Sequence, residues 1–247
     1  MNSKLCPVSE KLSTLRPQVY TDPRPKEYFD RFHERARRRG PSFVYEVVRV
    51  ISSLYAWTLL RARSVGANNV PETGPAILAP NHFSYMDHFL IGMFIRRKVR
   101  FMAKSQLFTP VARWVYLQGG VFPVRRGARD EDAFITAEAI LDASGVVAMY
   151  PEGGRSRTGE LQAHAKPGIG RLALQSGAPV VPIAILGSAK IRNWKRLRFP
   201  SVRVQYGEPL RFQREPGATR ERQQEVADAI FAEIRSLYAR LGQRVGG

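Results

Sequence analysis

The sequence contains very little cysteine and no long uninterrupted apolar stretch. Cys6 is the single cysteine in 247 residues, so no internal disulfide can form and the protein fits a reducing compartment. No run of 18 or more apolar residues occurs, and the longest candidate, residues 43–60, contains Glu46 and Arg49. We therefore expect no simple membrane-spanning helix. The first residues carry no apolar core behind their early charges, so we also expect no secretory signal.

Several familiar site patterns are missing as well. Four scattered histidines and one cysteine give no zinc-ligand spacing. The sequence has neither a Walker-type phosphate loop nor a dinucleotide fingerprint. We accordingly expect no bound metal and no cofactor. His33 lies in a charged segment, His88 directly follows an aspartate, and His164 lies in a loop-like run. We expect none of these three histidines to be catalytic.

The charge of the chain is strongly unbalanced. Lysine and arginine total 39 against 21 acidic residues, which gives a net charge of +18 with histidine neutral. This surplus predicts an anionic partner: nucleic acid, an anionic membrane surface or a phosphorylated substrate. Hydrophobic residues make up 44% and charged residues 24%, as in a globular protein with a sizeable core. The length fits one large domain, or one domain with an appendage.

The first quarter of the chain differs from the rest. Residues 1–24 are poor in apolar side chains, and we expect a poorly ordered arm there. Residues 25–66 are basic, and between residues 44 and 55 apolar side chains recur at helical spacing. Over the first 66 residues, 13 basic residues face 6 acidic ones. A basic amphipathic helix can lie in a membrane interface, or its apolar face can pack on the protein core; both alternatives stay open.

Strands and helices alternate in the remaining part, residues 67–247. Short apolar runs predict strands at 76–79, 99–103, 120–124, 146–150, 180–186 and 202–206. Helical patterns cover 86–95, 107–117, 131–143 and 169–175, and a last helix carries Ile230, Ile234, Leu237 and Leu241. This predicts an α/β fold with a mixed, mostly parallel sheet flanked by helices. Ligands of such sheets bind beyond the carboxyl ends of the strands, so His82, Arg125 and Glu152, each shortly after a predicted strand, can face one crevice.

Residues 81–87, Asn-His-Phe-Ser-Tyr-Met-Asp, form the most informative run. His82 and Asp87 are five positions apart, which on a regular helix turns the side chains roughly 140° from one another. They meet only if the backbone bends between them, as it does where a strand gives way to a helix. A carboxylate that holds one imidazole nitrogen leaves the other able to take a proton, which makes His82 a candidate general base. The alternative is that Ser84 or Asp87 caps a helix and His82 merely packs.

Two further runs are rich in glycine and arginine. Residues 119–127 carry the adjacent Arg125 and Arg126, whose guanidinium groups match the geometry of phosphate. Residues 150–157, Tyr-Pro-Glu-Gly-Gly-Arg-Ser-Arg, combine glycines that allow a ligand close to the backbone with two arginines and a serine. Each run has a plain alternative, a charged strand end for the first and a β-turn for the second. Lys104 can add charge to the same crevice, or be ordinary surface charge.

In order and spacing these runs resemble the four blocks of the glycerolipid acyltransferases, of the 1-acylglycerol-3-phosphate acyltransferase type. The matching residues are Asn81, His82, Ser84 and Asp87 in the first block; Phe122 with Arg125 or Arg126 in the second; Pro151, Glu152, Gly153, Arg155 and Ser156 in the third; and Val181, Pro182 and Ile183 in the fourth. The resemblance covers about residues 70–210. Gly154 stands where the family usually has threonine, which removes a hydroxyl and keeps the backbone.

The resemblance implies transfer of an acyl group from acyl-CoA or an acyl-carrier protein to the hydroxyl of a lysophospholipid, with lysophosphatidic acid giving phosphatidic acid. His82 is then the general base and Asp87 orients it, without a covalent acyl-enzyme. The substrate-binding residues are expected to be Asn81, Ser84, Lys104, Phe122, Arg125, Arg126, Glu152, Gly153, Gly154, Arg155 and Ser156. With the basic segment, this predicts an anionic membrane surface as partner, at the cytoplasmic face of the cell membrane.

Two other interpretations remain open. The same chemistry can act on another acceptor, such as a lyso-ornithine lipid or a glycolipid, because the pocket walls decide the acceptor. Alternatively, a basic protein without catalysis can bind nucleic acid or anionic lipid through the arginines at 37–39 and the cluster at 190–198. Charge alone does not require the spacing of His82 and Asp87, and no nucleic-acid motif is present, so we expect no specific nucleic-acid partner.

Overall fold

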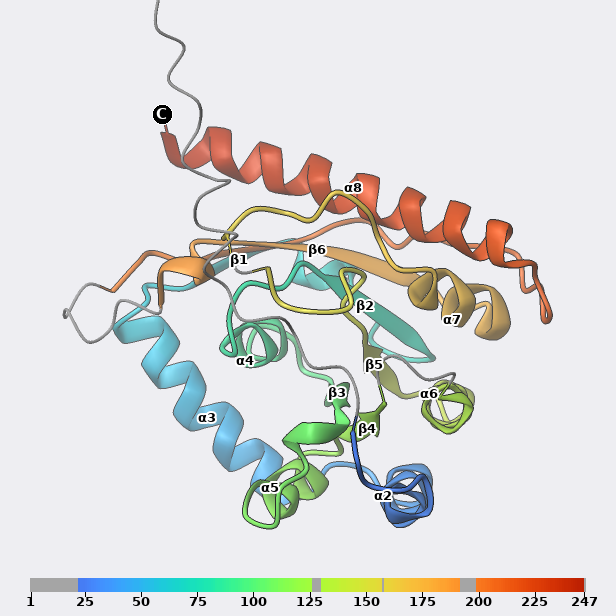
Figure 1. Ribbon diagram of the computed structural model, residues 1–247. Coiled ribbons are helices and arrows are strands. Elements are labelled where there is room, and N and C mark those ends of the chain that lie inside the picture. The colour runs from blue at the N-terminus through green and yellow to red at the C-terminus, as the bar shows by residue number, and fades with distance from the viewer. Residues whose placement is uncertain (1–21, 126–129, 157, 192–198, 247) are drawn as a thin grey trace, which may run out of the picture.

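The computed structural model describes residues 22–125, 130–156, 158–191 and 199–246, in which helices cover both faces of a twisted sheet (Figure 1). The strands are β1 Arg63–Val65, β2 Ala76–Pro80, β3 Val99–Lys104, β4 Phe122–Val124, β5 Val146–Ala148, β6 Val180–Leu186 and β7 Arg203–Tyr206. Their order in the sheet is β1-β7-β6-β2-β5-β3-β4. The pair β6 and β7 is antiparallel and the other pairs are parallel. The predicted mixed, mostly parallel α/β sheet is confirmed.

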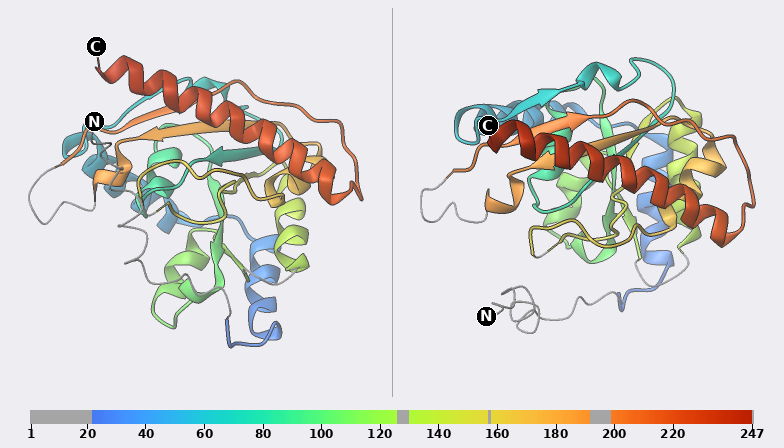
Figure 2. Two further views of the ribbon diagram at one scale, coloured as in Figure 1. Left: turned by 45° about the horizontal axis from the view of Figure 1, so that its top comes forward. Right: turned by 90° about the horizontal axis from the view of Figure 1, so that it is seen from above.

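The helices form one layer on each side of this sheet. They are α2 Glu27–Arg38, α3 Phe43–Thr58, α4 Asp87–Gly92, α5 Ala112–Gln118, α6 Glu131–Asp142, α7 Gly168–Ser176 and α8 Arg220–Gly246, with short 3₁₀ turns at Ala67–Asn69 and Ser105–Leu107. One apolar cluster joins the sheet to α2, α6, α7 and α8, and a second joins it to α3 and α4. Figure 2 shows the long α8 lying across the sheet. The arm expected at 1–24 lies outside the described residues up to residue 21.

The central strand β2 shows how the sequence creates two covered faces. Side chains alternate along a strand, so Ile77 and Ala79 enter the cluster with α6, α7 and α8, whereas Ala76 and Leu78 enter the cluster with α3 and α4. All five residues of β2 are buried, which explains why this strand has a continuous apolar run.

The helix α7 is held tightly against α8. A Cβ at Gly170 would lie 1.9 Å from the backbone oxygen of Gln223, so only glycine allows this crossing. Gly177 ends α7 in the left-handed region, with φ +64°. The apolar side chains expected on the last helix, Ile230, Ile234, Leu237 and Leu241, are all buried. The helices predicted at 169–175 and in the C-terminal part of the chain are thus confirmed.

Several element boundaries differ from expectation. β1 belongs to the sheet, with Arg63 opposite Arg203, although the sequence placed it in the helical segment before residue 67. Three residues with one apolar side chain carry too little pattern to be recognised. The strand expected at 146–150 ends at Ala148, because the chain then leaves the sheet and enters a turn. The helix expected at 107–117 begins only at Ala112, after Pro110, which lacks an amide hydrogen.

The helices α2 and α3 differ in how far their apolar side chains are buried. In α2, Phe29 and Phe32 are buried against the protein. In α3, by contrast, Ile51, Leu54 and Trp57 are 62%, 55% and 53% exposed. The packing alternative therefore holds for α2, whereas these three side chains of α3 are uncovered and contact of α3 with a membrane stays a prediction. None of the described helices is both long enough and apolar enough to span a bilayer.

Candidate active site

His82 and Asp87 meet, because the chain bends between the end of β2 and the start of α4. The Nδ1 atom of His82 lies 2.9 Å from Oδ2 of Asp87, and both side chains are buried. A carboxylate only accepts hydrogen bonds, so Nδ1 of the neutral imidazole carries the proton and Nε2 presents a lone pair. The sequence hypothesis of a carboxylate-held imidazole is thus realised in the geometry.

The same carboxylate also shapes the loop. Oδ2 of Asp87 accepts hydrogen bonds from the backbone amides of Phe83 and Ser84, each at 2.7 Å. The Ser84 hydroxyl in turn accepts from the amide of Met86 at 3.2 Å. Ser84 and Asp87 therefore brace the loop before α4 and do not cap the helix, whose N-cap residue Met86 has no side-chain cap hydrogen bond; the catalytic role of His82 stays a prediction. Because one oxygen serves the imidazole and two amides, the position of the base and the path of the loop depend on a single charged group.

The backbone of His82 is fixed by the loop that follows β5. Its amide donates to Oε1 of Glu152 at 2.8 Å, and its carbonyl accepts from the amide of Ser156 at 2.8 Å. Oε2 of Glu152 accepts from the amide of Gln162 at 3.2 Å. Glu152 is 1% exposed, so its carboxylate joins three segments of backbone inside the protein. Burial, partly offset by these two amide hydrogen bonds, raises the pKa of Glu152 to about 7.

Two small features complete this frame. Gly153 has φ +66°, a conformation that favours glycine, and its amide closes a turn onto the carbonyl of Tyr150 at 3.0 Å. Asn81 bridges to β6, since its side-chain amide donates to the carbonyl of Ile185 at 3.1 Å and its oxygen accepts from the amide of Ile185 at 2.7 Å. Buried amide groups paired in this way extend the β2–β6 contact beyond Pro80.

The arginines predicted for the site follow β5 and β4, which lie on the same side of β2 in the sheet. The guanidinium of Arg155 lies over the ring of Tyr85, 3.6 Å from its centroid. Arg125 follows β4, and its amide donates to Oδ2 of Asp130 at 2.6 Å while its Nε lies 3.8 Å from the same oxygen. Three strand intervals of about 4.8 Å separate β4 from β2, so Arg125 lies roughly 14 Å across the sheet edge. Lys104 ends β3 and is partly buried.

A cavity of about 340 Å³ opens beside the base. It lies between α3, α4, α5 and β3, and its lining includes Val44, Val48, Phe89, Phe101, Val115 and Val121. Tyr85 and His88 also line it, and the His88 ring lies 5.3 Å from the His82 ring, edge to face. The apolar cavity therefore reaches the immediate neighbourhood of His82.

A family model described as Acyltransferase matches residues 61–186, just over half of the chain. The chain belongs to the acyltransferase family. The matched region begins before β1 and ends with β6, so it contains His82, Asp87 and the loop that holds them. The resemblance inferred from the sequence blocks is thereby confirmed.

Named relatives of this acyltransferase are similar to it over about two thirds of its length. The 1-acyl-sn-glycerol-3-phosphate acyltransferase BAT2, chloroplastic, of Brassica napus is 28% identical over 66% of this chain and 46% of its own. A 1-acyl-sn-glycerol-3-phosphate acyltransferase of Cocos nucifera is 30% identical over 66% of this chain and 54% of its own. The chain thus spans about half the length of these curated relatives.

A solved structure supports the fold of the acyltransferase. The crystal structure of the 1-acyl-sn-glycerophosphate (LPA) acyltransferase PlsC from Thermotoga maritima superposes with a TM-score of 0.61 and 25% identity, over 83% of each chain. The α/β sheet with helices on both faces is therefore an architecture that an acyltransferase is known to have.

The structure gathers most of the sequence-predicted site residues of the acyltransferase and leaves others aside. His82, Asp87, Asn81, Ser84 and the loop 152–156 lie together, and their buried members mainly hydrogen-bond to backbone. In particular, the side chains of Asn81 and Glu152 are occupied by protein groups, and their contact with substrate stays a prediction. Phe122 is fully buried in β4, where its ring lies 6.5 Å from that of His33. Arg126 lies outside the described residues.

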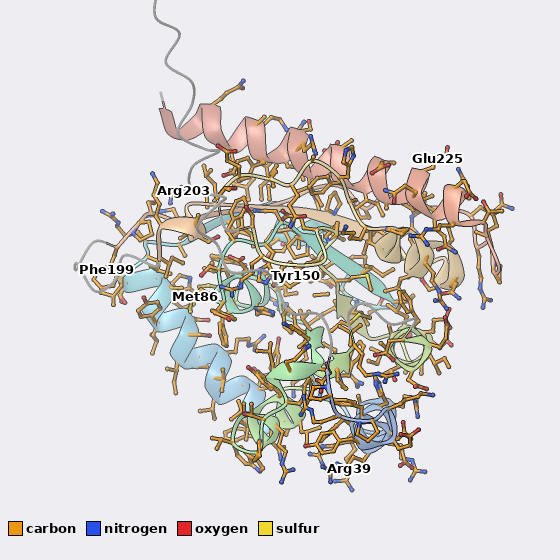
Figure 3. All side chains as sticks on the ribbon, in the orientation of Figure 1. Arg39, Met86, Tyr150, Phe199, Arg203 and Glu225 are labelled. Carbon is orange, nitrogen blue, oxygen red and sulfur yellow. The ribbon has the colours of Figure 1, made fainter. Side chains whose placement is uncertain are left out.

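Three aromatic neighbours were not recognised from the sequence. Tyr150 stacks on His82, with ring centroids 3.9 Å apart and an angle of 22° between the planes, and it lies near the middle of the molecule in Figure 3. The ring of Tyr85 packs against the guanidinium of Arg155. His88 contacts the ring of His82 and also lines the cavity. Burial, with a smaller contribution from His82, lowers the pKa of His88 to about 4, so this histidine stays neutral. Tyr85 and Tyr150 lie inside the motif runs and His88 directly follows one, which was the available signal. In the described part of the chain, no group of three metal-ligating side chains gathers.

Proposed function

We propose that this acyltransferase moves a fatty acyl group from an acyl thioester to the hydroxyl of lysophosphatidic acid, which gives phosphatidic acid. The observation that carries the proposal is one constellation: a carboxylate-held imidazole, His82, beside an apolar cavity and an arginine. The imidazole suits a nucleophilic hydroxyl, the apolar cavity suits an acyl chain, and the arginine suits a phosphate. The relatives' names suggest the substrate class, and this geometry supports the proposal.

His82 acts as the general base in this reaction. An alcohol is a poor nucleophile at neutral pH, so Nε2 removes the hydroxyl proton while the oxygen attacks the thioester carbonyl. The tetrahedral intermediate then collapses, the carbon–sulfur bond breaks, and the imidazolium returns the proton to the leaving thiolate. Asp87 holds the tautomer and stabilises the imidazolium. A positioned base of this kind contributes about 10²–10⁴-fold to the rate.

Arg155 binds the phosphate of the acceptor, and Arg125, further along the same edge of the sheet, contributes positive charge. Guanidinium groups form charge-assisted, bidentate hydrogen bonds with phosphate oxygens. Arg155 is partly exposed and held over Tyr85, which lines the cavity beside the base. A phosphate held there places the acceptor hydroxyl near His82. The acyl chain of the donor, acyl-CoA or acyl-carrier protein, fills the cavity of about 340 Å³, within the range usual for small-molecule sites.

The uncovered apolar face of α3 contacts the membrane that supplies the acceptor. Other residues of the same helix, Val44 and Val48, line the cavity, as does the exposed Val115 of α5. The net charge of +18 favours an anionic membrane surface, at the cytoplasmic face of the cell membrane. A lipid acceptor can then reach the base from the bilayer without crossing water.

The deciding experiment is transfer from labelled acyl-CoA to lysophosphatidic acid in liposomes, with wild type, His82→Ala and His164→Ala. His164 is exposed in a loop and provides the matched control. We expect product from wild type and His164→Ala and a loss of at least about 10²-fold in His82→Ala. Equal product from wild type and His82→Ala would show that His82 is not the base. Acyl-carrier protein as donor, and monoacylglycerol, lyso-ornithine lipid and a glycolipid as acceptors, run in parallel; preference for one of these acceptors would reassign the substrate.

A further inference from the structure

The ring of Tyr150 covers one face of the His82 imidazole. The centroids are 3.9 Å apart and the planes differ by 22°, so the rings are stacked. A second ring near His82, that of His88, meets both rings edge to face, at 5.3 Å from His82 and 5.2 Å from Tyr150. Of these contacts, the Tyr150 stack alone presents an electron-rich face to the imidazole.

The hydroxyl of Tyr150 does not explain why the residue is there. It is buried and has no hydrogen-bond partner among the described residues, although a buried hydroxyl without a partner costs free energy. Burial raises the pKa of Tyr150 well above its ordinary value, so the phenol stays neutral and puts no negative charge beside His82. What Tyr150 offers His82 is therefore its ring.

We propose that Tyr150 is a positioning residue that stabilises the protonated form of His82 through its ring face, and so raises the basicity of the general base. A cation over an aromatic face is attracted by the ring quadrupole. The imidazole is neutral before the reaction and cationic once it has taken the hydroxyl proton, so the attraction is stronger in the transition state than in the ground state. The inference rests on the proposed role of His82, and it adds a second group to Asp87.

Other charged and titratable groups face His82 and must be held constant in any test. They are Asp87 and His88 on α4 and Glu152 on the loop after β5, with Arg155 acting on His88. Glu152 contacts the backbone amide of His82, and its own titration near pH 7 can enter a kinetic pH profile. A direct spectroscopic titration of His82 is therefore the primary readout, and it needs no turnover.

The experiment is an NMR titration of the full chain in detergent micelles, with carbon-13 at Cε1 of its four histidines. The His82 signal is assigned by its loss in His82→Ala. We expect Tyr150→Leu to lower the pKa of His82 by about 0.5 to 1.5, as an attraction of cation–π size requires. Tyr150→Phe keeps the ring face and should leave that pKa near the wild-type value. A folded Tyr150→Leu protein in which His82 titrates as in wild type would overturn the proposal.

A second comparison separates the electrostatic effect of the ring from a change in packing. Replacing the phenylalanine of the Tyr150→Phe variant by pentafluorophenylalanine keeps the ring's shape and reverses its quadrupole. We expect the pKa of His82 to fall in the fluorinated protein, and the acidic limb of the kcat/KM profile to move with it. An unchanged pKa on fluorination, or a fall in Tyr150→Phe as large as in Tyr150→Leu, means that the ring face is not the cause. Because the NMR readout is independent of acyl transfer, failure of the proposed function would be seen separately, in the liposome assay.

Discussion

The guanidinium carbon of Arg155 lies 3.6 Å from the centre of the Tyr85 ring. The two residues come from different motif runs, one before α4 and the other in the loop after β5, and their contact joins the edge of the apolar cavity to a cationic group. The aromatic ring limits where an otherwise flexible side chain can reach. Arg155 is thereby held on the same side of the crevice as the base.

Removing this arginine should weaken binding of the acceptor. We expect Arg155→Ala to raise the KM for lysophosphatidic acid by about 10- to 100-fold, the size of hydrogen bonds to a charged group. The kcat should change little, because the phosphate is bound equally in ground and transition states. The measurement is a steady-state titration of the acceptor at saturating acyl-CoA. An unchanged KM would mean that the phosphate binds elsewhere, and monoacylglycerol, which lacks a phosphate, should be insensitive to the substitution.

The supporting ring should matter less than the arginine itself. We expect Tyr85→Leu to raise the same KM by about 2- to 30-fold, since a cation–π contact contributes about 0.5–2 kcal/mol. Tyr85→Phe retains the ring and should remain close to wild type, which makes it the matched control. If both variants raise the KM equally, the hydroxyl of Tyr85 is responsible and the ring is not.

Catalysis should require the carboxylate of Asp87, and a side chain of the same shape should not replace it. An amide of the same shape, as in Asp87→Asn, carries no charge to stabilise the imidazolium and can select the wrong tautomer of His82. We expect kcat to fall by about 10²–10⁴-fold, comparable to loss of a general base. Single-turnover acyl transfer gives the rate, and circular dichroism checks that the protein is folded. A folded variant with wild-type kcat would contradict the role of the pair.

The raised pKa of Glu152 should appear in the stability of the protein. The value moves from 4.5 to about 7, mainly by burial, so the folded state binds this proton more tightly than the unfolded chain does. The resulting stabilisation is complete below pH 4.5 and is lost as the pH rises to about 7, by roughly 3 kcal/mol. We expect Glu152→Gln to lack this loss. Urea unfolding of both proteins across this pH range measures it, and parallel pH dependences would disprove the assignment.

The exposed face of α3 should bind membranes. We expect Ile51→Glu to reduce flotation with anionic liposomes, because a charge on this face opposes insertion at the interface. Ile135→Glu provides a matched control, since Ile135 of α6 is 50% exposed, close to the 62% of Ile51, on the other side of the sheet. Equal flotation of wild type and Ile51→Glu would exclude α3 as the contact. Flotation lost equally in both variants would indicate that charge, and not this face, controls binding.

The parts of the fold with strong local patterns were predictable from sequence. The strand at Val180–Leu186 is a continuous apolar run and was located to the residue. β1 was not predicted, because its partner Arg203–Tyr206 lies far away in sequence and no local pattern marks it. Short edge strands take their structure from pairing, which a single sequence does not display.

The candidate site divides in the same way. The pairing of His82 with Asp87 was predictable, since their spacing and the strand-to-helix bend follow from local sequence. The stack of Tyr150 on His82 was not, because it depends on β2 and β5 being neighbours in the sheet. For the apolar face of α3 the sequence allows two alternatives, a membrane interface or the protein core, because periodicity marks an apolar face and says nothing about what covers it.

The hydrogen bonds that hold His82 also set the order in which the site can form during synthesis. A chain emerges from the ribosome N-terminus first, so His82 and Asp87 appear long before Glu152 and Ser156, and Ile185 appears later still. Until β5 and β6 have been made, the backbone of His82 and the side chain of Asn81 lack the hydrogen-bond partners that fix them. A nascent chain therefore carries His82 and Asp87 before the groups that fix their loop, and the arrangement is complete only when the central sheet is assembled.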